Sequence, residues 1–555
     1  MGKRSALFLT SSALFLIGSY HCYAVIMEPH AYGFPKSTDE APGDLSSLLL
    51  LQPGDSLDFH ALGKAPQQGP TEADRIAHRY GITGKNTNIL TLESGEANFL
   101  KGTSVLSKQN LIPAGWNWLA DHGVKVASVL KQMAPDAQVN LLDPYFLSFK
   151  QQMRLLSTLD AHKFWLVNWS GAYGFLFTSH FNDLFSNLES RARWVRDLRM
   201  TLGRLDSHTQ KEEVLKERGI AEWSPHLKEW AMNMPQETEK AHPQLQTALT
   251  KDIHNLVANH KKLTEILPQN HLLIHAMGNN RADLESFLPR EFGITTHHLF
   301  TDKSFLEKTI LVAAMEKNGD LKHYSNRPEQ RQKTNNSSWN YLSDKDLAAL
   351  QKATITAPTD TSSLRGNFYS RTFTSDTLGG TSGAAPLVTG VASLLHEAFP
   401  NLSHDQVRSA ILNAATRNIF IGHDTLMYDP NTTRVKKGEL ETSKSESSAF
   451  YEIQEGSASY RKIIPFDPSQ YGQGILNTET SFFYASMLDI IRNETHNTAW
   501  IKQYWPTQAE TFIDKVKKDK EELIEKTDEE KRYYLEHLLN QPYHPSVSLF
   551  VQIII

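Results

Sequence analysis

The sequence predicts an α/β fold of three layers, in which helices flank a mostly parallel central sheet. Two observations support this prediction. Short apolar runs alternate along the chain with segments of helical character. Most of the runs end at small or polar residues that are typical of turns, such as Asp143-Pro144 and Ser170-Gly171. Strands that alternate with helices are typical of a parallel sheet covered on both faces.

The elements follow in chain order from their apolar patterns. Buried strands are short apolar runs bounded by turn residues, whereas helices repeat apolar residues on one face. Ser403 and Gln406 have the spacing of a capping box, which predicts a helix start. We expect strands over residues 88–92, 137–142, 164–169, 271–276, 309–314 and 547–555, and helices over 71–80, 124–132 and 386–398.

Three polar segments interrupt or extend this pattern. Residues 180–268 are rich in Arg and Trp and predict a solvated helical hairpin with an apolar inner stripe, or alternatively a binding module. Residues 430–460 are rich in Ser, Lys and Glu and predict a surface loop. Residues 486–555 predict a charged helical extension. The main domain is therefore expected over residues 71–485.

The first 24 residues have the features of an export signal. Lys3 and Arg4 precede an uncharged apolar run over residues 6–17, and Ala24 ends a segment suited to cleavage. The run is short for a membrane span, although an uncleaved anchor is the alternative. Residues 25–70 follow as a leader rich in Pro, Gly and Asp, expected to be loosely structured.

Composition narrows the class of protein further. Cys22 is the only cysteine and lies inside the signal, so the mature chain would have no disulfide. This favours a bacterial protein that is exported to the periplasm or the extracellular space. A formal net charge of −5 gives no indication of a nucleic-acid partner. No later segment is apolar enough over 18 residues to predict another membrane helix.

The most informative segment is residues 380–386, with the sequence Gly-Thr-Ser-Gly-Ala-Ala-Pro. Small residues on both sides leave the hydroxyl of Ser382 unobstructed, and an Ala-rich helical run follows. A helix that starts at the Ser directs backbone N–H groups and a positive dipole end toward bound negative charge. A serine nucleophile needs this environment because its attack on a carbonyl creates an oxyanion. A Ser or Thr helix cap is the plainer alternative.

Two further residues supply the remaining chemistry. His122 precedes Gly123 and an amphipathic helix, and a His at a helix start suits a general base. Asn279 follows a predicted strand, where its amide could donate to an oxyanion. A histidine in the core or an Asn in a turn is the alternative for each of them.

Together these segments resemble the subtilisin-like serine proteases, in which an acid, a His, an Asn and a Ser follow in that order. The resemblance covers residues 75–485 apart from the insertions. It rests on segments with the sequences NILTLESG, HGVKVAS, VNWSG, AMGNN, GTSGAAP and YGQGILN, which span residues 88–95, 122–128, 167–171, 276–280, 380–386 and 471–477.

The resemblance implies a role for each candidate. Ser382 would be the nucleophile, His122 the base and Glu93 the acid that orients it. Asn279 and the backbone N–H of Ser382 would bind the oxyanion of a polypeptide substrate. Four residues would line the substrate groove, namely Ser170, Gly171, Ala172 and Gly278, and Tyr173 would narrow it.

Two departures from the family pattern bear on activity. Glu93 stands where the family has Asp, and its extra methylene requires a shift to keep the hydrogen bond to His122. Val124 stands where the family usually has Thr, which removes a hydroxyl near the His. A catalytically weakened fold used for binding is therefore the alternative function.

The enzyme would need no cofactor. Calcium often stabilises this family, but no segment has a clear ligand pattern, and the sequence does not support a metallohydrolase.

Overall fold

The computed structural model describes the central domain, the insertion and the extension in part. The predictions for residues 1–24, 25–70, 71–80 and 547–555 lie outside the described residues. The described residues are 81–93, 103–105, 117–142, 165–170, 188–217, 225–234, 244–245, 247–252, 271–279, 303–316, 319–328, 343–367, 372–417, 419–421, 425–428, 453–455, 458–460, 462–493, 497–504 and 509–539.

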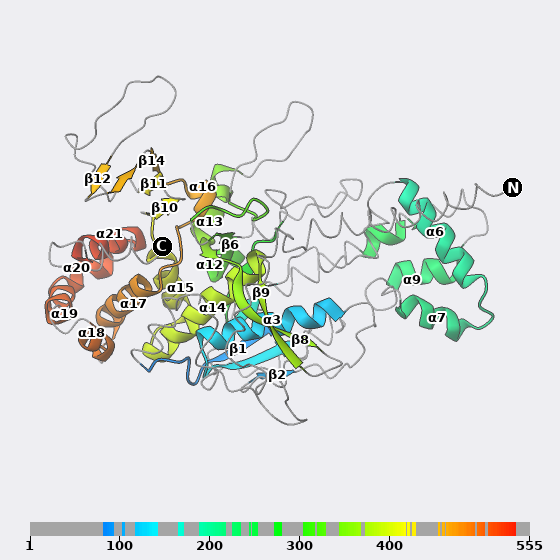
Figure 1. Ribbon diagram of the computed structural model, residues 1–555, viewed down its shortest axis with the longest axis horizontal. Coiled ribbons are helices and arrows are strands. Elements are labelled where there is room, and N and C mark those ends of the chain that lie inside the picture. The colour runs from blue at the N-terminus through cyan, green and yellow to red at the C-terminus, as the bar shows by residue number, and fades with distance from the viewer. Residues whose placement is uncertain are drawn as a thin grey trace, which may run out of the picture.

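The centre of the molecule is a seven-stranded sheet whose neighbouring strands all run parallel (Figure 1). Its order is β2-β3-β1-β4-β5-β6-β7. Strands of a parallel sheet that is buried on both faces are rich in apolar residues, and every residue of β5 and β6 is buried. The strands are β1 (Asn88–Leu92), β2 (Thr103–Val105), β3 (Gln138–Leu142), β4 (Trp165–Trp169), β5 (His271–Ala276), β6 (Thr309–Met315) and β7 (Thr354–Pro358).

This architecture confirms the predicted α/β class. The five predicted sheet strands agree with β1, β3, β4, β5 and β6 to within one residue at each end. The short edge strand β2 and strand β7 were not predicted as strands. The structure also corrects the setting of His122, because helix α3 (Asn117–Met133) begins five residues before it. His122 therefore lies inside a helix and not at its start.

The strand order determines where a site can form. The chain runs outward from β1 through β3 to β2 on one side, and from β4 through β5 and β6 to β7 on the other. Strands β1 and β4 are neighbours at the point where this direction reverses. In open parallel sheets, ligands bind at the carboxyl ends of the strands beside such a point. Glu93 and Ser170 follow β1 and β4 directly at this edge.

Helix α14 (Gly380–Ala398) lies along strands β4 to β7 and packs against α3. Nearly all of its residues are buried, and the small residues of its first turns allow this close contact. A Cβ at Gly390 would lie 2.3 Å from the Cβ of Met133 on α3, so only glycine fits there. Helix α15 (His404–Asn413) follows, and its Ser403–Gln406 capping box forms as predicted.

The 180–268 segment contains a bundle with a hydrophobic core of its own. Its described helices are α6 (Leu188–Leu202), α7 (His208–Glu217) and α9 (Pro225–Met232), followed by helical residues within 244–252 (Figure 1). Trp194 and Trp230 stack with ring centroids 6.5 Å apart. The buried residues of this separate cluster are Val195, Leu198, Leu202, Leu215, Leu227, Trp230, Ala231, Leu245, Ala248 and Leu249.

The C-terminal extension belongs to the main core. Phe512, Val516 and Leu535 are buried in the cluster that also holds the sheet, α3 and α14. Arg532 is 1% exposed and donates to the carbonyl oxygen of Ala415 at 2.8 Å. The helices are α17 (Thr478–Arg492), α18 (Ala499–Tyr504), α19 (Ala509–Lys518), α20 (Lys520–Glu525) and α21 (Asp528–Leu539).

Smaller elements complete the described fold. The predicted surface loop at 430–460 is corrected in part, because residues 453–460 contain an antiparallel strand pair. The remaining strands are β8 (Thr361–Asn367), β9 (Thr372–Leu378), β10 (Ile419–Ile421), β11 (Thr425–Tyr428), β12 (Ile453–Glu455), β13 (Ala458–Tyr460) and β14 (Lys462–Pro465). The remaining helices are α12 (Lys303–Lys308), α13 (Asp344–Ala353) and α16 (Pro468–Tyr471).

Candidate active site

Glu93 and His122 form a partly buried pair at the end of strand β1. The Oε2 atom of Glu93 lies 2.8 Å from Nδ1 of His122, and the two side chains are 2% and 19% exposed. An ionised carboxylate only accepts hydrogen bonds, so Nδ1 donates and Nε2 of a neutral ring is left as an acceptor. This arrangement orients the ring as a general base requires. Val124 is 3% exposed in the main core, where it contributes packing in place of a hydroxyl.

Ser382 occupies the first turn of helix α14. Gly379 is the N-cap, and Gly380 adopts a φ of +74°, a left-handed conformation that favours glycine. A Cβ at Gly380 would lie 2.7 Å from Nδ2 of Asn279. At Gly383, a Cβ would lie 2.2 Å from the carbonyl oxygen of Leu378. Glycines on both sides of Ser382 therefore permit the tight turn that presents it.

Three of the four backbone N–H groups over residues 380–383 have a hydrogen-bond acceptor among the described residues, and the fourth, that of Ser382, has none. The N–H of Gly380 donates to the hydroxyl of Tyr324 at 3.1 Å, and that of Thr381 donates to Oδ1 of Asn279 at 2.9 Å. The N–H of Gly383 donates to the Gly379 carbonyl oxygen at 3.2 Å. The N–H of Ser382 has no hydrogen-bond partner among the described residues. An N–H in this position is a donor ready for an oxyanion.

The Asn279 side chain contacts Thr381, the residue directly before Ser382. Its Oδ1 accepts from both the N–H and the hydroxyl of Thr381, which fixes the orientation of the amide. Its Nδ2 therefore points away from Thr381, with no acceptor among the described residues. Asn326 holds the two residues before Asn279. Its Nδ2 donates to the carbonyl oxygen of Met277 at 2.8 Å, and its backbone N–H donates to that of Gly278 at 3.0 Å.

The hydroxyl of Ser382 is hydrogen-bonded to the backbone at the end of strand β4. It donates to the carbonyl oxygen of Ser170 at 2.8 Å, and Ser382 is 9% exposed. A hydroxyl has one proton to donate, so Ser382 does not donate to His122 in this conformation. Below it, Asn168 donates to Oγ of Ser170 at 2.9 Å and accepts from Thr389 at 2.9 Å. This network joins the end of β4 to helix α14.

The structure places the predicted residues as follows. Ser382 lies in the first turn of α14, and Asn279 accepts from Thr381 of that turn. The carbonyl oxygen of Ser170 accepts from Ser382, and Glu93 contacts His122. Gly278 lies beside Thr381, to whose hydroxyl its N–H donates at 3.1 Å. Gly171, Ala172 and Tyr173 lie outside the described residues. The sequence did not reveal that Tyr324 and Thr359 contact this turn.

Burial perturbs two titratable groups near the site. It lowers the pKa of His275, on strand β5, to about 4, so this ring is neutral at pH 7. Burial, together with the charge of Asp360, raises the pKa of Tyr324, whose hydroxyl therefore keeps its proton at neutral pH.

Within the described part of the chain, no cluster of three or more His, Cys, Asp or Glu side chains is arranged to hold a metal ion. No helix of the described residues is long and apolar enough to cross a membrane.

Comparison with protein families adds to this geometry. Residues 230–443 match the family described as the subtilase family. The subtilase resemblance is thereby confirmed. The matched segment contains Asn279 and Ser382, whereas Glu93 and His122 precede it. No curated protein matches the sequence.

Solved structures with a detectable likeness to the chain include several maturation proteases. The maturation protease PagA is 15% identical, with a TM-score of 0.34, and the likeness covers 74% of this chain and 98% of that one. The PatG macrocyclase domain is 14% identical, with a TM-score of 0.36, and 74% and 95% are covered. The A-subunit of an AB5 toxin from E. coli is 13% identical, with a TM-score of 0.35, and 75% and 97% are covered. Scores this low carry no information about the reaction or substrate of the chain.

Proposed function

We propose that the chain is an exported serine endopeptidase that uses Glu93, His122 and Ser382, with Asn279 in its oxyanion hole. One observation carries the proposal. The N–H of Ser382 and Nδ2 of Asn279 are both without an acceptor among the described residues, and the imidazole of His122 is separately oriented by the Glu93 carboxylate. Two unused donors at a nucleophilic Ser are what stabilisation of a tetrahedral intermediate requires.

The proposed reaction follows from these atoms. The Ser382 hydroxyl turns from the Ser170 carbonyl toward Nε2 of His122, and Oγ attacks the peptide carbonyl as its proton passes to Nε2. The carbonyl electron pair becomes an oxyanion held by Asn279 and the Ser382 N–H. The C–N bond then breaks, and His122 returns the proton to the leaving amine. Water, deprotonated by His122, releases the acyl group from Ser382 by the reverse sequence.

The groove and the surroundings belong to the same proposal. Ser170, Gly171, Ala172 and Gly278 would pair with and border the polypeptide. The chemistry requires no cofactor, and any calcium would be structural. The signal-like start of the sequence supports export to the periplasm or the extracellular space.

A fluorophosphonate probe tests the nucleophile directly. We expect the chain from Val25 onward to be labelled and to hydrolyse peptides, and Ser382→Ala and His122→Ala to abolish both while the protein remains folded. Full peptide hydrolysis in either variant would contradict the mechanism. A folded protein that takes up no label would instead support the alternative, a fold used for binding.

Variants of the acid test the least usual part of the site. Glu93→Ala leaves Nδ1 of His122 without its acceptor and should lower kcat by about 10⁴-fold, which is what loss of the orienting acid costs in other Ser-His-Asp triads. Glu93→Asp keeps the charge on a shorter side chain and should retain activity or raise it. Unchanged activity in Glu93→Ala would assign the orienting role to another residue.

A further inference from the structure

The turn before Ser382 is held by side chains from three successive strand ends. Asn279 follows β5, Tyr324 lies in the loop after β6, and Thr359 directly follows β7. These strands are neighbours in the sheet, in that order. Their carboxyl ends therefore meet along one edge, on the side of Asn279 that lies away from β4 and Ser170. Only Asn279 has a role in the proposed reaction, so the other two contacts need an explanation.

Tyr324 and Thr359 bind the peptide groups on the two sides of Gly380. The Tyr324 hydroxyl accepts from the N–H of Gly380 at 3.1 Å, and the Thr359 hydroxyl donates to the carbonyl oxygen of Gly380 at 2.6 Å. Thr359 is 2% exposed, and Tyr324 is half-buried. Together they constrain the backbone at Gly380, whose φ of +74° is left-handed and differs from that of a regular right-handed helix.

This constraint reaches the oxyanion donors through Thr381. The peptide group whose carbonyl oxygen binds Thr359 is the one whose N–H, on Thr381, binds Oδ1 of Asn279. Rotation of that peptide would turn the Asn279 amide, and it would also move the N–H of the next residue, Ser382. The Tyr324 contact has a second consequence, because it occupies a first-turn N–H that would otherwise compete for the oxyanion.

We propose that Tyr324 and Thr359 are positioning residues of the oxyanion hole. They orient the Asn279 amide and the Ser382 N–H without touching the reacting atoms. The inference rests on the proposed peptidase function and assigns to it two residues outside the triad. Donors that are already oriented need no reorganisation when the negative charge develops. Their loss should therefore lower kcat while leaving KM almost unchanged.

A double-mutant cycle with Asn279→Ala tests this proposal. Asn279→Ala should lower kcat by about 10²–10³-fold, which is the usual effect of losing one such donor. Tyr324→Phe and Thr359→Val each remove one hydrogen bond at nearly constant volume, and each should lower kcat by about 5–10-fold. In the Asn279→Ala background the same substitutions should have a smaller effect than in the unmodified protein, because the amide is gone and only their influence on the Ser382 N–H remains.

Tyr471→Phe is the matched control. Its hydroxyl likewise bonds to a backbone group, the carbonyl oxygen of Gly319 at 3.3 Å, and among the described residues no hydrogen bond joins it to the turn. It should leave kcat unchanged. The melting temperature and the fraction of protein labelled by the fluorophosphonate probe exclude effects of folding.

Two outcomes would overturn the inference. The first is that Tyr324→Phe and Thr359→Val retain full kcat in an active enzyme. The second is that each lowers kcat by the same factor in the Asn279→Ala background as in the unmodified protein. Absence of hydrolysis and labelling in the unmodified protein would instead refute the proposed function, so the two failures are distinguishable.

Discussion

The insertion and the C-terminal extension look alike in the sequence but differ in the structure. Both are polar, helix-rich and strongly charged. The described helices of the insertion bury their apolar residues in a separate cluster, which includes Leu198 and Trp230. The extension buries Phe512 and Leu535 in the same cluster as the sheet and helix α14. The described helices of the insertion therefore have their own hydrophobic core, whereas the extension completes the core of the main domain.

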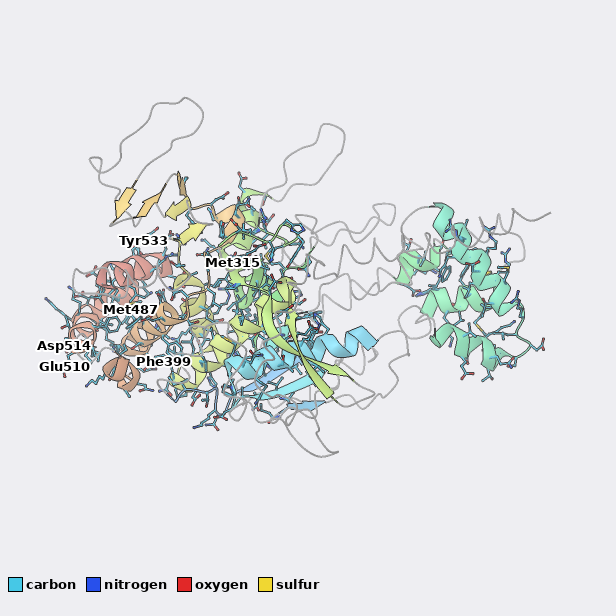
Figure 2. The ribbon with its side chains drawn as sticks, viewed as in Figure 1. Met315, Phe399, Met487, Glu510, Asp514 and Tyr533 are labelled. Carbon is cyan, nitrogen blue, oxygen red and sulfur yellow. The ribbon has the colours of Figure 1, made fainter. Side chains whose placement is uncertain are left out.

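The faces of helix α19 show how a charged helix can belong to a core. Phe512, Ile513 and Val516 are buried, whereas Glu510 and Asp514 are exposed. In Figure 2, Glu510 and Asp514 lie at the outer edge of the extension, and Phe399 and Met487 lie deeper, toward the sheet. A high proportion of charge thus describes only one face of a helix and does not indicate whether the other face is buried.

Deletion of each region should give the largest contrast. Removing residues 509–539 exposes the main core, and we expect the remaining chain to lose its cooperative unfolding transition. Replacing residues 188–252 by a flexible Gly/Ser linker should leave that transition in place. Near-ultraviolet circular dichroism during thermal unfolding measures both. Cooperative melting of the chain without residues 509–539 would show that the extension is dispensable.

Acidification should have the next largest effect, by lowering the stability of the central domain. Burial lowers the pKa of His271, His275 and His396, all in the central domain, to about 4. An unfolded His titrates near 6.5, so between these values the unfolded state binds more protons. The stabilisation is complete above about pH 6.5 and is lost as the pH falls toward 4. For the fully buried His275 alone, this amounts to about 3 kcal/mol.

The measurement is the melting temperature of the main transition between pH 8 and pH 4. We expect it to fall steadily below pH 6.5, and His275→Gln should reduce the slope. A transition that is independent of pH in this range would show that the three rings are not neutral and buried as the structure has them.

Truncation of one core side chain in each region should give a smaller contrast. Phe512→Ala removes a ring that packs on Phe483, with centroids 5.8 Å apart, and should lower the free energy of unfolding of the main domain by about 3–5 kcal/mol. Leu198→Ala should destabilise the insertion by about 2–5 kcal/mol and leave the main transition unchanged. Hydrogen exchange, resolved by peptide, distinguishes the regions. Equal loss of protection in both would mean that they share one core.

Helix caps should give the smallest contrast. Asn477 caps α17 by accepting from the N–H of Thr480 at 2.9 Å, and Asn477→Ala should cost the main domain about 1 kcal/mol. Asp252 accepts from the N–H groups of His226 and Leu227 at the start of α9, at 3.1 and 2.7 Å. Asp252→Ala should cost about 1–3 kcal/mol, confined to the insertion. A shift of the main transition by Asp252→Ala would contradict this separation.

Local patterns predicted much of the central domain. The apolar runs at 88–92 and 271–276 are strands in the structure with the same bounds, because a buried strand needs little more than a short apolar run between turn residues. The predicted start of α3 was seven residues too late, because Asp121, His122 and Gly123 are weak helix formers that tertiary packing holds in helical conformation.

The candidate site was only partly accessible from the sequence. Ser382, His122 and Asn279 could be named because their residue types and chain order are characteristic of one chemistry. Glu93 could be named as the orienting acid only through the family resemblance, and its contact with His122 was seen in the structure. The contacts of Tyr324 and Thr359 depend on the order of β5, β6 and β7. Such contacts join residues far apart in the chain, and no local pattern encodes them.

The sequence by itself determined the α/β class, most of the strands and the residue types of the site. The tertiary structure alone decided that the extension completes the core, that the insertion does not, and which backbone donors beside Ser382 remain unbound. The physical reason is the range of the interactions. Hydrophobic periodicity acts within a few residues, whereas burial and hydrogen-bond satisfaction depend on the partners that the whole fold brings together.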